Sequence, residues 1–78
     1  MMFYIDANIF ILAALYQDKK AIKAREIIKK TIEGQIIAAT SSLTIDEVVW
    51  KVWKETKNRK LAIEQGSKIL QFDNLKII

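Results

Sequence analysis

The chain has 78 residues, of which 51% are hydrophobic and 28% are charged, a balance typical of a small globular domain. It contains no cysteine and no histidine, which excludes disulfides, thiolate metal sites, zinc fingers and catalysis by a histidine base. Its net charge of +4 favours polyanionic partners only weakly. We therefore expect residues 1–78 to form one domain whose chemistry depends on carboxylates, hydroxyls, amides and lysines.

Membrane insertion and secretion are both disfavoured. The longest unbroken apolar run covers residues 9–16, whereas a membrane-spanning helix needs about 20 residues. A secretory signal places cations before its apolar core, and Asp6 stands in that position here. We expect a cytoplasmic protein that does not associate with membranes.

The first half of the chain predicts one strand and two helices. Residues 2–5 are apolar without interruption, as in a strand buried on both faces. Residues 8–16 are rich in alanine and leucine, which favour a helix. After a polar break, residues 21–33 repeat apolar side chains at helical spacing with lysines on the other side. Gly34 follows as a helix-ending residue.

The second half repeats this order. We predict a strand at residues 36–39, helices at 44–57 and 61–72, and a last strand at 75–78. Strands that alternate with pairs of helices imply a parallel sheet with right-handed crossovers. The predicted fold is therefore α/β, a three-layer α/β/α arrangement with a short parallel sheet and the order β-α-α-β-α-α-β.

Polar side chains follow the first two strands. Parallel strands end at the same edge of their sheet, where ligands of open α/β folds bind. Asp6 follows the first strand, and the second gives way to hydroxyl residues, so we expect the following to gather: Asp6, Asn8, Thr40, Ser41 and Glu47. Such oxygen ligands suit Mg²⁺ or Mn²⁺. A cation there would lower the pKa of a bound water, a route to phosphodiester hydrolysis without histidine.

Structural roles are the alternative for the same residues. Asp6 or Asn8 fits the N-cap of the first helix. Thr44 and Glu47 have the spacing of a capping box, and Glu47 stands four residues before Lys51, the spacing of a helical ion pair. Capping by Asn8 or Thr44 is compatible with metal binding by Asp6 and Glu47.

Two segments resemble PIN domains. "FYIDANIF" resembles the opening strand of that family, with its Asp-x-Asn pattern, and "ATSSLTIDEVVWKV" resembles its second block, a Ser/Thr-rich turn before a helix with an early Glu. The resemblance implies a nuclease dependent on Mg²⁺ or Mn²⁺. For many prokaryotic members it implies a VapC-like toxin that cleaves RNA and is held by a cognate antitoxin. It makes Asp6 and Glu47 the catalytic metal ligands, with Asn8 and Ser41 as supporting polar positions.

The sequence also departs from the family pattern. PIN domains carry one or two further acids in a later block, whereas this sequence ends at "LKII". Asp73 is the only late acid, and it precedes the last strand, so it should lie at the opposite edge. We therefore expect the N-terminal portion of a PIN fold with weak or absent activity. The alternative hypothesis is a non-catalytic oligomerising or binding remnant of such a nuclease. In either case the open edge of the first strand and the apolar first helix predict a homo-oligomer.

A second candidate surface contains two tryptophans among lysines. Trp50, Lys51 and Lys54 suit nucleic-acid contact, because bases stack on aromatic rings and cations meet phosphates. The competing interpretation puts Trp53 in the core beside Val48 and Val52, with the lysines solvated, and we predict Trp53 to be buried and Trp50 marginal. A third hypothesis follows, a basic module that binds nucleic acid without cleavage and whose affinity falls steeply with salt.

Overall fold

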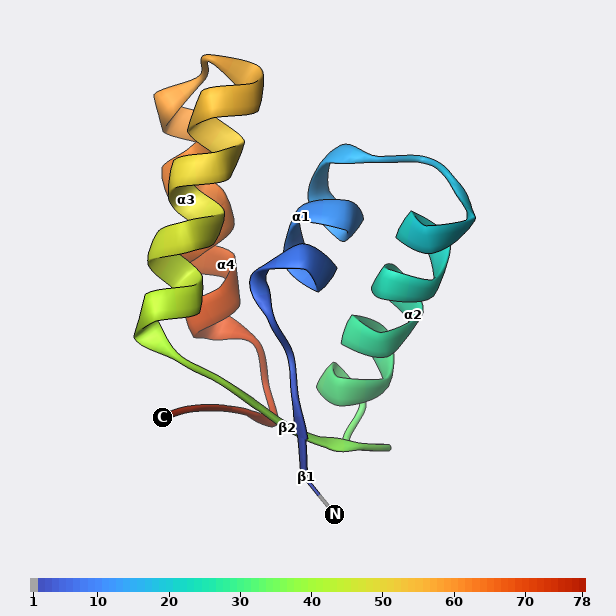
Figure 1. Cartoon of the computed structure of the whole chain (residues 1–78). Coiled ribbons are helices and arrows are strands. Elements are labelled where there is room, and N and C mark those ends of the chain that lie inside the picture. Colours follow the sequence, from blue (N-terminus) through green and yellow to red (C-terminus); the bar gives the residue numbers. More distant parts are fainter. Residues whose placement is uncertain (1) are drawn as a thin grey trace.

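The computed structural model describes residues 2–78, which form a three-stranded sheet and four helices. In chain order the elements are β1 (Met2–Tyr4), α1 (Ala7–Leu15), α2 (Lys19–Ile32), β2 (Ile37–Thr40), α3 (Ser42–Thr56), α4 (Arg59–Gln71) and β3 (Leu75–Ile77). Figure 1 shows two helical hairpins, α1 with α2 and α3 with α4, side by side above the strands. The predicted α/β class and element order are confirmed.

The strands pair in parallel, and β2 lies between β1 and β3. In this register Tyr4 is opposite Ala39. The backbone N–H of Ile5 donates to the carbonyl oxygen of Ala39 at 2.8 Å and continues the pairing beyond β1. The carboxyl ends of β1 and β2 therefore lie next to each other, as the parallel arrangement predicts.

One face of the sheet carries the hydrophobic core. Ile5, Ala38 and Leu75 pack there with side chains from α1, α3 and α4. Contact between α1 and α3 joins the two crossovers into one helical layer. Right-handed crossovers that advance across a sheet in one direction place their helices on the same face. A second helical layer, part of the predicted α/β/α arrangement, is not formed by residues 2–78.

The opposite face of the sheet and the edge strand β1 are open. Met2, Tyr4 and Ile37 are 49%, 54% and 55% exposed. As expected from the sequence, β1 has a neighbour on one side only. Apolar strand edges of this kind invite pairing with another chain.

Three helices begin two residues earlier than predicted. Asp18, Ser41 and Asn58 are the N-caps of α2, α3 and α4, and each side chain accepts a backbone N–H from the first turn of its helix. The polar stretches interpreted as breaks therefore contain the caps themselves. Asp, Ser and Asn favour this position because their oxygens replace missing helical acceptors.

Two glycines have conformational or packing roles. Gly34 follows α2 with φ +79°, a backbone conformation that glycine adopts without strain, as predicted for a helix end. Gly66 lies in α4, where a Cβ atom would come within 2.6 Å of Val49 Cγ2 on α3. The absence of a side chain at Gly66 thus permits the close approach of α3 and α4.

The first helix buries only part of its apolar surface. Ala7, Phe10 and Ile11 are its buried residues, although apolar side chains surround nearly the whole helix. No helix in the described part of the chain combines the length and apolar character that crossing a bilayer requires.

Candidate functional site

Hydroxyl groups join the end of β1 to the start of α3. The phenol oxygen of Tyr4 lies 2.9 Å from Ser41 Oγ and 2.7 Å from Thr44 Oγ1. Nearby in the interior, the buried hydroxyl of Thr40 donates to the carbonyl oxygen of Ile5 at 2.8 Å. These bonds fix the first helical turn of α3 beside the carboxyl end of β1.

The hydroxyl cluster changes the acidity of Tyr4. The hydrogen bond with Ser41, and next the one with Thr44, lower the pKa of the Tyr4 phenol from its ordinary value. The negative charge of Asp6 opposes this and raises that pKa.

Asp6 is the N-cap of α1. Its Oδ1 accepts the backbone N–H groups of Asn8 at 3.1 Å and Ile9 at 3.4 Å. The alternative of Asn8 as the cap is therefore wrong, because Asp6 has the extended backbone of an N-cap and Asn8 is already helical. Both capping bonds use Oδ1, so the other oxygen of this exposed carboxylate is available to a cation. Capping and metal binding are compatible for Asp6.

Glu47 has no structural role of the kinds expected from the sequence. The predicted capping box at Thr44 and Glu47 is wrong, because Ser41 caps α3 and its Oγ accepts the N–H of Thr44 at 3.2 Å. Glu47 consequently lies in the second helical turn rather than the first. Within residues 2–78 it forms no ion pair with Lys51. The side chain is exposed, so its carboxylate is available for a ligand.

Asn8 and Ser41 lie at the same edge of the sheet as Asp6, whereas Asp73 lies at the opposite edge. Asn8 is exposed in the first turn of α1, and the hydroxyl of Ser41 is engaged as the α3 cap. Asp73 precedes β3 beside Asn74, whose side chain donates to the carbonyl oxygen of Ile32 at 2.9 Å, at the opposite edge of the sheet. No group of three or more acidic side chains arranged to hold a metal occurs in residues 2–78.

The tryptophans of α3 lie on the surface. Trp50 is 53% exposed and Trp53 is 48% exposed, so the prediction that Trp53 is buried is wrong. The side of α3 that meets α4 carries Val49, against Gly66. Trp53 follows Val49 by one helical turn on this side of α3, and its side chain nevertheless stays half exposed.

A shallow groove runs between these tryptophans. Its volume is about 370 Å³, and it is lined by Trp50, Trp53, Lys54 and Lys57. The Lys54 ammonium lies 5.0 Å from the centroid of the Trp50 ring, a cation–π contact. Lys51, also predicted to contact nucleic acid, is exposed on α3 but does not line the groove.

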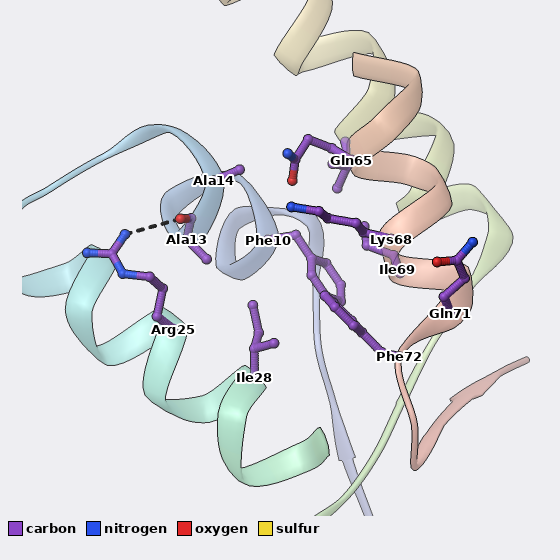
Figure 2. A pocket seen from close by; sticks show the side chains of 11 residues that line it. Phe10, Ala13, Ala14, Arg25, Ile28, Gln65, Lys68, Ile69, Gln71 and Phe72 are labelled. Atoms are coloured by element: carbon purple, nitrogen blue, oxygen red, sulfur yellow. Dashed lines mark hydrogen bonds between the residues drawn. The ribbon is translucent and has the colours of Figure 1, made fainter. Parts of the chain in front are cut away.

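A larger apolar groove of about 520 Å³ lies between α1, α2 and α4 (Figure 2). Phe10 and Phe72 stack in its wall with ring centroids 6.4 Å apart. Arg25 and Lys68 bring positive charge to its lining, and Arg25 Nη1 donates to the carbonyl oxygen of Ala13 at 3.1 Å. Neither Asp6 nor Glu47 lines this groove, so it is separate from the candidate metal site.

A sequence model of PIN domains matches residues 3–78, nearly the whole chain. The chain belongs to the PIN domain family. PIN domains are nucleases that generally use divalent metal ions. Neither the curated proteins nor the solved structures include a significant match to the chain.

Asp6 and Glu47 are the candidate ligands for such an ion in this PIN domain. Asp6 and Glu47 offer carboxylate oxygens and are both exposed, and oxygen donors are what Mg²⁺ and Mn²⁺ prefer. The sequence did not predict Tyr4 or its hydrogen bond with Thr44, which organise this edge of the sheet. The available sequence signal for Tyr4 was its position at the end of the first strand, two residues before Asp6.

Proposed function

We propose that this PIN domain is a divalent-metal-dependent ribonuclease in which Asp6 and Glu47 hold Mg²⁺ or Mn²⁺. The observation that supports this is the hydroxyl cluster of Tyr4, Ser41 and Thr44, which ties the strand before Asp6 to the helix that carries Glu47. Bound there, the ion supplies a Lewis acid that lowers the pKa of a coordinated water. Asp6 contributes the oxygen that does not cap α1, and Glu47 contributes a carboxylate free of ion pairs within residues 2–78.

Binding of the metal is expected to be weak. Two carboxylates fill a small part of the coordination shell, and Mg²⁺ commonly keeps several waters when few protein ligands are present. We expect RNA cleavage to be slow for the same reason. Asn8, exposed in the first turn of α1, offers an amide oxygen as a supporting ligand.

Cleavage of single-stranded RNA in Mn²⁺ tests the proposal. Asp6→Asn removes the charge but keeps an N-cap residue of equal quality, so α1 should stay folded while cleavage is lost. Glu47→Gln should have the same effect. The matched control is Asp73→Asn, which removes an acid at the opposite edge and should cleave normally. Cleavage that persists in Asp6→Asn, or in excess EDTA, rejects the assignment.

We also propose that this nuclease is the toxin of a toxin–antitoxin pair. Such a nuclease should slow the growth of a bacterial host that expresses it, and Asp6→Asn should restore growth. A cognate antitoxin would cover the apolar groove between α1, α2 and α4, because Phe10 and Phe72 offer an apolar surface with the cations Arg25 and Lys68 beside them. Equal growth inhibition by the wild type and by Asp6→Asn contradicts a nuclease toxin.

A non-catalytic oligomerising module is the second candidate function. The half-exposed Met2 and Phe3 on the open edge strand favour it, with the partly exposed α1 as a further contact surface. Sedimentation should then give a multiple of the 9.0 kDa chain mass, and Phe3→Lys should reduce it to the monomer. Oligomers with no RNA cleavage and no rise of melting temperature in Mn²⁺ favour this candidate over the nuclease. A monomeric mass at micromolar concentration counts against it.

A further inference from the structure

We propose that the groove of Trp50, Trp53, Lys54 and Lys57 on α3 is a subsite for single-stranded RNA. It would hold a base and the neighbouring phosphates of a strand that continues from the metal site. The identity of that strand as the substrate rests on the proposed ribonuclease function. The binding itself does not, because it requires neither Asp6 nor a metal ion.

The first argument is the alignment of the groove with Glu47. Trp50 and Lys54 follow Glu47 by three and seven residues, a spacing that places these three on one stripe of α3, and Lys57 follows at the end of the helix. At 1.5 Å of rise per residue, this stripe extends about 10 Å from Glu47 along the axis of α3. A strand bound at Glu47 can therefore continue directly into the groove.

The second argument is the pair of exposed indoles. Large aromatic rings are good stacking surfaces for bases, and stacking tolerates any base because each has a π face. The groove volume of about 370 Å³ is within the range of small-molecule sites, which is enough for one base against the rings. Lys54 is already held over the Trp50 ring at 5.0 Å. A base that takes this ring face frees the Lys54 ammonium for the adjacent phosphate.

The third argument is charge. Both charged residues that line the groove are lysines, and no acid lines it. Two further cations, Arg59 and Lys60, follow at the start of α4. Exposed bases and a phosphate backbone together are the features of single strands, since the bases of a duplex are stacked inside the helix. A single-stranded polyanion thus complements both the rings and the lysines.

The fourth argument is the backbone of Lys57. This residue ends α3 in the left-handed conformation, with φ 58°, where glycine is normally favoured. Its N–H donates to the carbonyl oxygen of Trp53 at 2.8 Å, an interaction that glycine would preserve. Backbone strain of this kind concentrates at functional sites. A long cationic side chain at this strained position is consistent with a binding role.

Intrinsic fluorescence tests the proposal directly, because the chain has only two tryptophans and both line the groove. The probe is a single-stranded oligouridylate of about 12 nucleotides, added in EDTA so that no cleavage occurs. We expect quenching of the tryptophan emission. The logarithm of the affinity should fall against the logarithm of salt concentration with a slope of about −1.4, the value for two phosphate contacts.

Variants separate stacking from charge. Trp50→Ala and Trp53→Ala should each weaken binding about 5- to 100-fold, as measured through the remaining tryptophan. Lys57→Gly removes the cation and relieves the backbone strain, so its melting temperature should be equal or higher while its affinity falls and its salt slope flattens by about 0.7. Lys23→Ala is the matched control. It also removes one positive charge, but from α2, which is distant from the groove in the sequence, and it should bind the oligouridylate as the wild type does. Unchanged affinity in Lys57→Gly, with a higher melting temperature, would mean a structural role and overturn the proposal.

Further controls keep this subsite separate from the nuclease proposal. Asp6→Asn should bind the oligouridylate normally in EDTA, even though it should not cleave RNA. If the wild type binds the oligouridylate but does not cleave RNA in Mn²⁺, the ribonuclease proposal is rejected and the RNA subsite is retained. Double-stranded RNA that binds as tightly as the single strand overturns the subsite. An emission shift caused by protein concentration alone also overturns it, because a second copy of the chain would then cover the groove.

Discussion

The phenol oxygen of Tyr4 lies 2.7 Å from Oγ1 of Thr44, which stands 40 positions later in the chain. This contact holds the last residue of β1 against the first turn of α3. Asp6 follows Tyr4 by two residues and Glu47 follows Thr44 by three, so both acids lie within three residues of this contact in the sequence. The proposed metal site depends on this contact, and several of its properties can be measured.

The pKa of Tyr4 should lie below the ordinary value of about 10. Absorbance titration in EDTA measures it in a Tyr16→Phe background, where Tyr4 is the only tyrosine. Ser41→Ala removes the bond that lowers this pKa most and should raise it, whereas Asp6→Asn removes an opposing charge and should lower it further. Because the folded pKa is the lower one, the stabilisation from this group is present above pH 10 and is lost as the pH falls through the folded pKa. Identical pKa values in all three proteins would exclude the cluster.

The N-cap at Asp6 should contribute measurably to stability. Asp6→Ala loses both backbone acceptor contacts of Oδ1 and should reduce the free energy of unfolding by about 1 kcal/mol. Asp6→Asn should change it by only a few tenths of a kcal/mol, since asparagine caps helices as well as aspartate does. Urea denaturation followed by circular dichroism measures both. Equal losses in the two variants would show that the charge, rather than the cap, stabilises α1.

The contact between α3 and α4 should not tolerate a side chain at Gly66. In Gly66→Ala the new methyl group would lie 2.6 Å from Val49 Cγ2, and the stiff valine cannot move aside without strain. Overpacking of this kind costs about 1–3 kcal/mol, against about 1 kcal/mol gained in helix propensity. We expect net destabilisation, which Val49→Ala in the same chain should partly relieve. Simple addition of the two single effects in thermal unfolding contradicts the proposed contact.

Arg25 should stabilise the turn between the first two helices. Its Nη1 donates to the carbonyl oxygens of Ala13 at 3.1 Å and Tyr16 at 3.0 Å, near the end of α1. Arg25→Met keeps much of the alkyl chain but removes the donors, so it should reduce the free energy of unfolding by about 1–2 kcal/mol. Hydrogen exchange should show faster opening at the end of α1 in this variant. Unchanged exchange there would mean that the two bonds contribute little.

The sequence predicts the order of elements well because each element carries a strong local signal. Residues 2–5 are uninterrupted by polar side chains, and Gly34 marks the end of α2. Helix starts were predicted less well, since Asp18 and Asn58 stand in polar stretches that resemble loops. Only the cap geometry shows that these residues begin helices.

The candidate site was predictable at the level of the sheet edge but not of its contacts. A parallel sheet brings Asp6 and Ser41 to one edge whatever the side chains do. The hydroxyl bonds of Tyr4 depend on distances between distant segments, which a sequence pattern does not contain. The burial of Trp53 was predicted wrongly because its position depends on which side of α3 meets Gly66, and this is a property of the packed helices.

Paramagnetic broadening by Mn²⁺ tests the proposed metal site of Asp6 and Glu47 most directly. In amide NMR spectra recorded during a Mn²⁺ titration, the signals of Asp6, Asn8 and Glu47 should broaden first and together. Signals of Asp73 and Asn74 at the opposite edge should remain sharp, and Asp6→Asn should abolish the selective loss. Broadening of Asp6 without Glu47, or equal broadening at both edges of the sheet, would contradict a metal ion held between the two carboxylates.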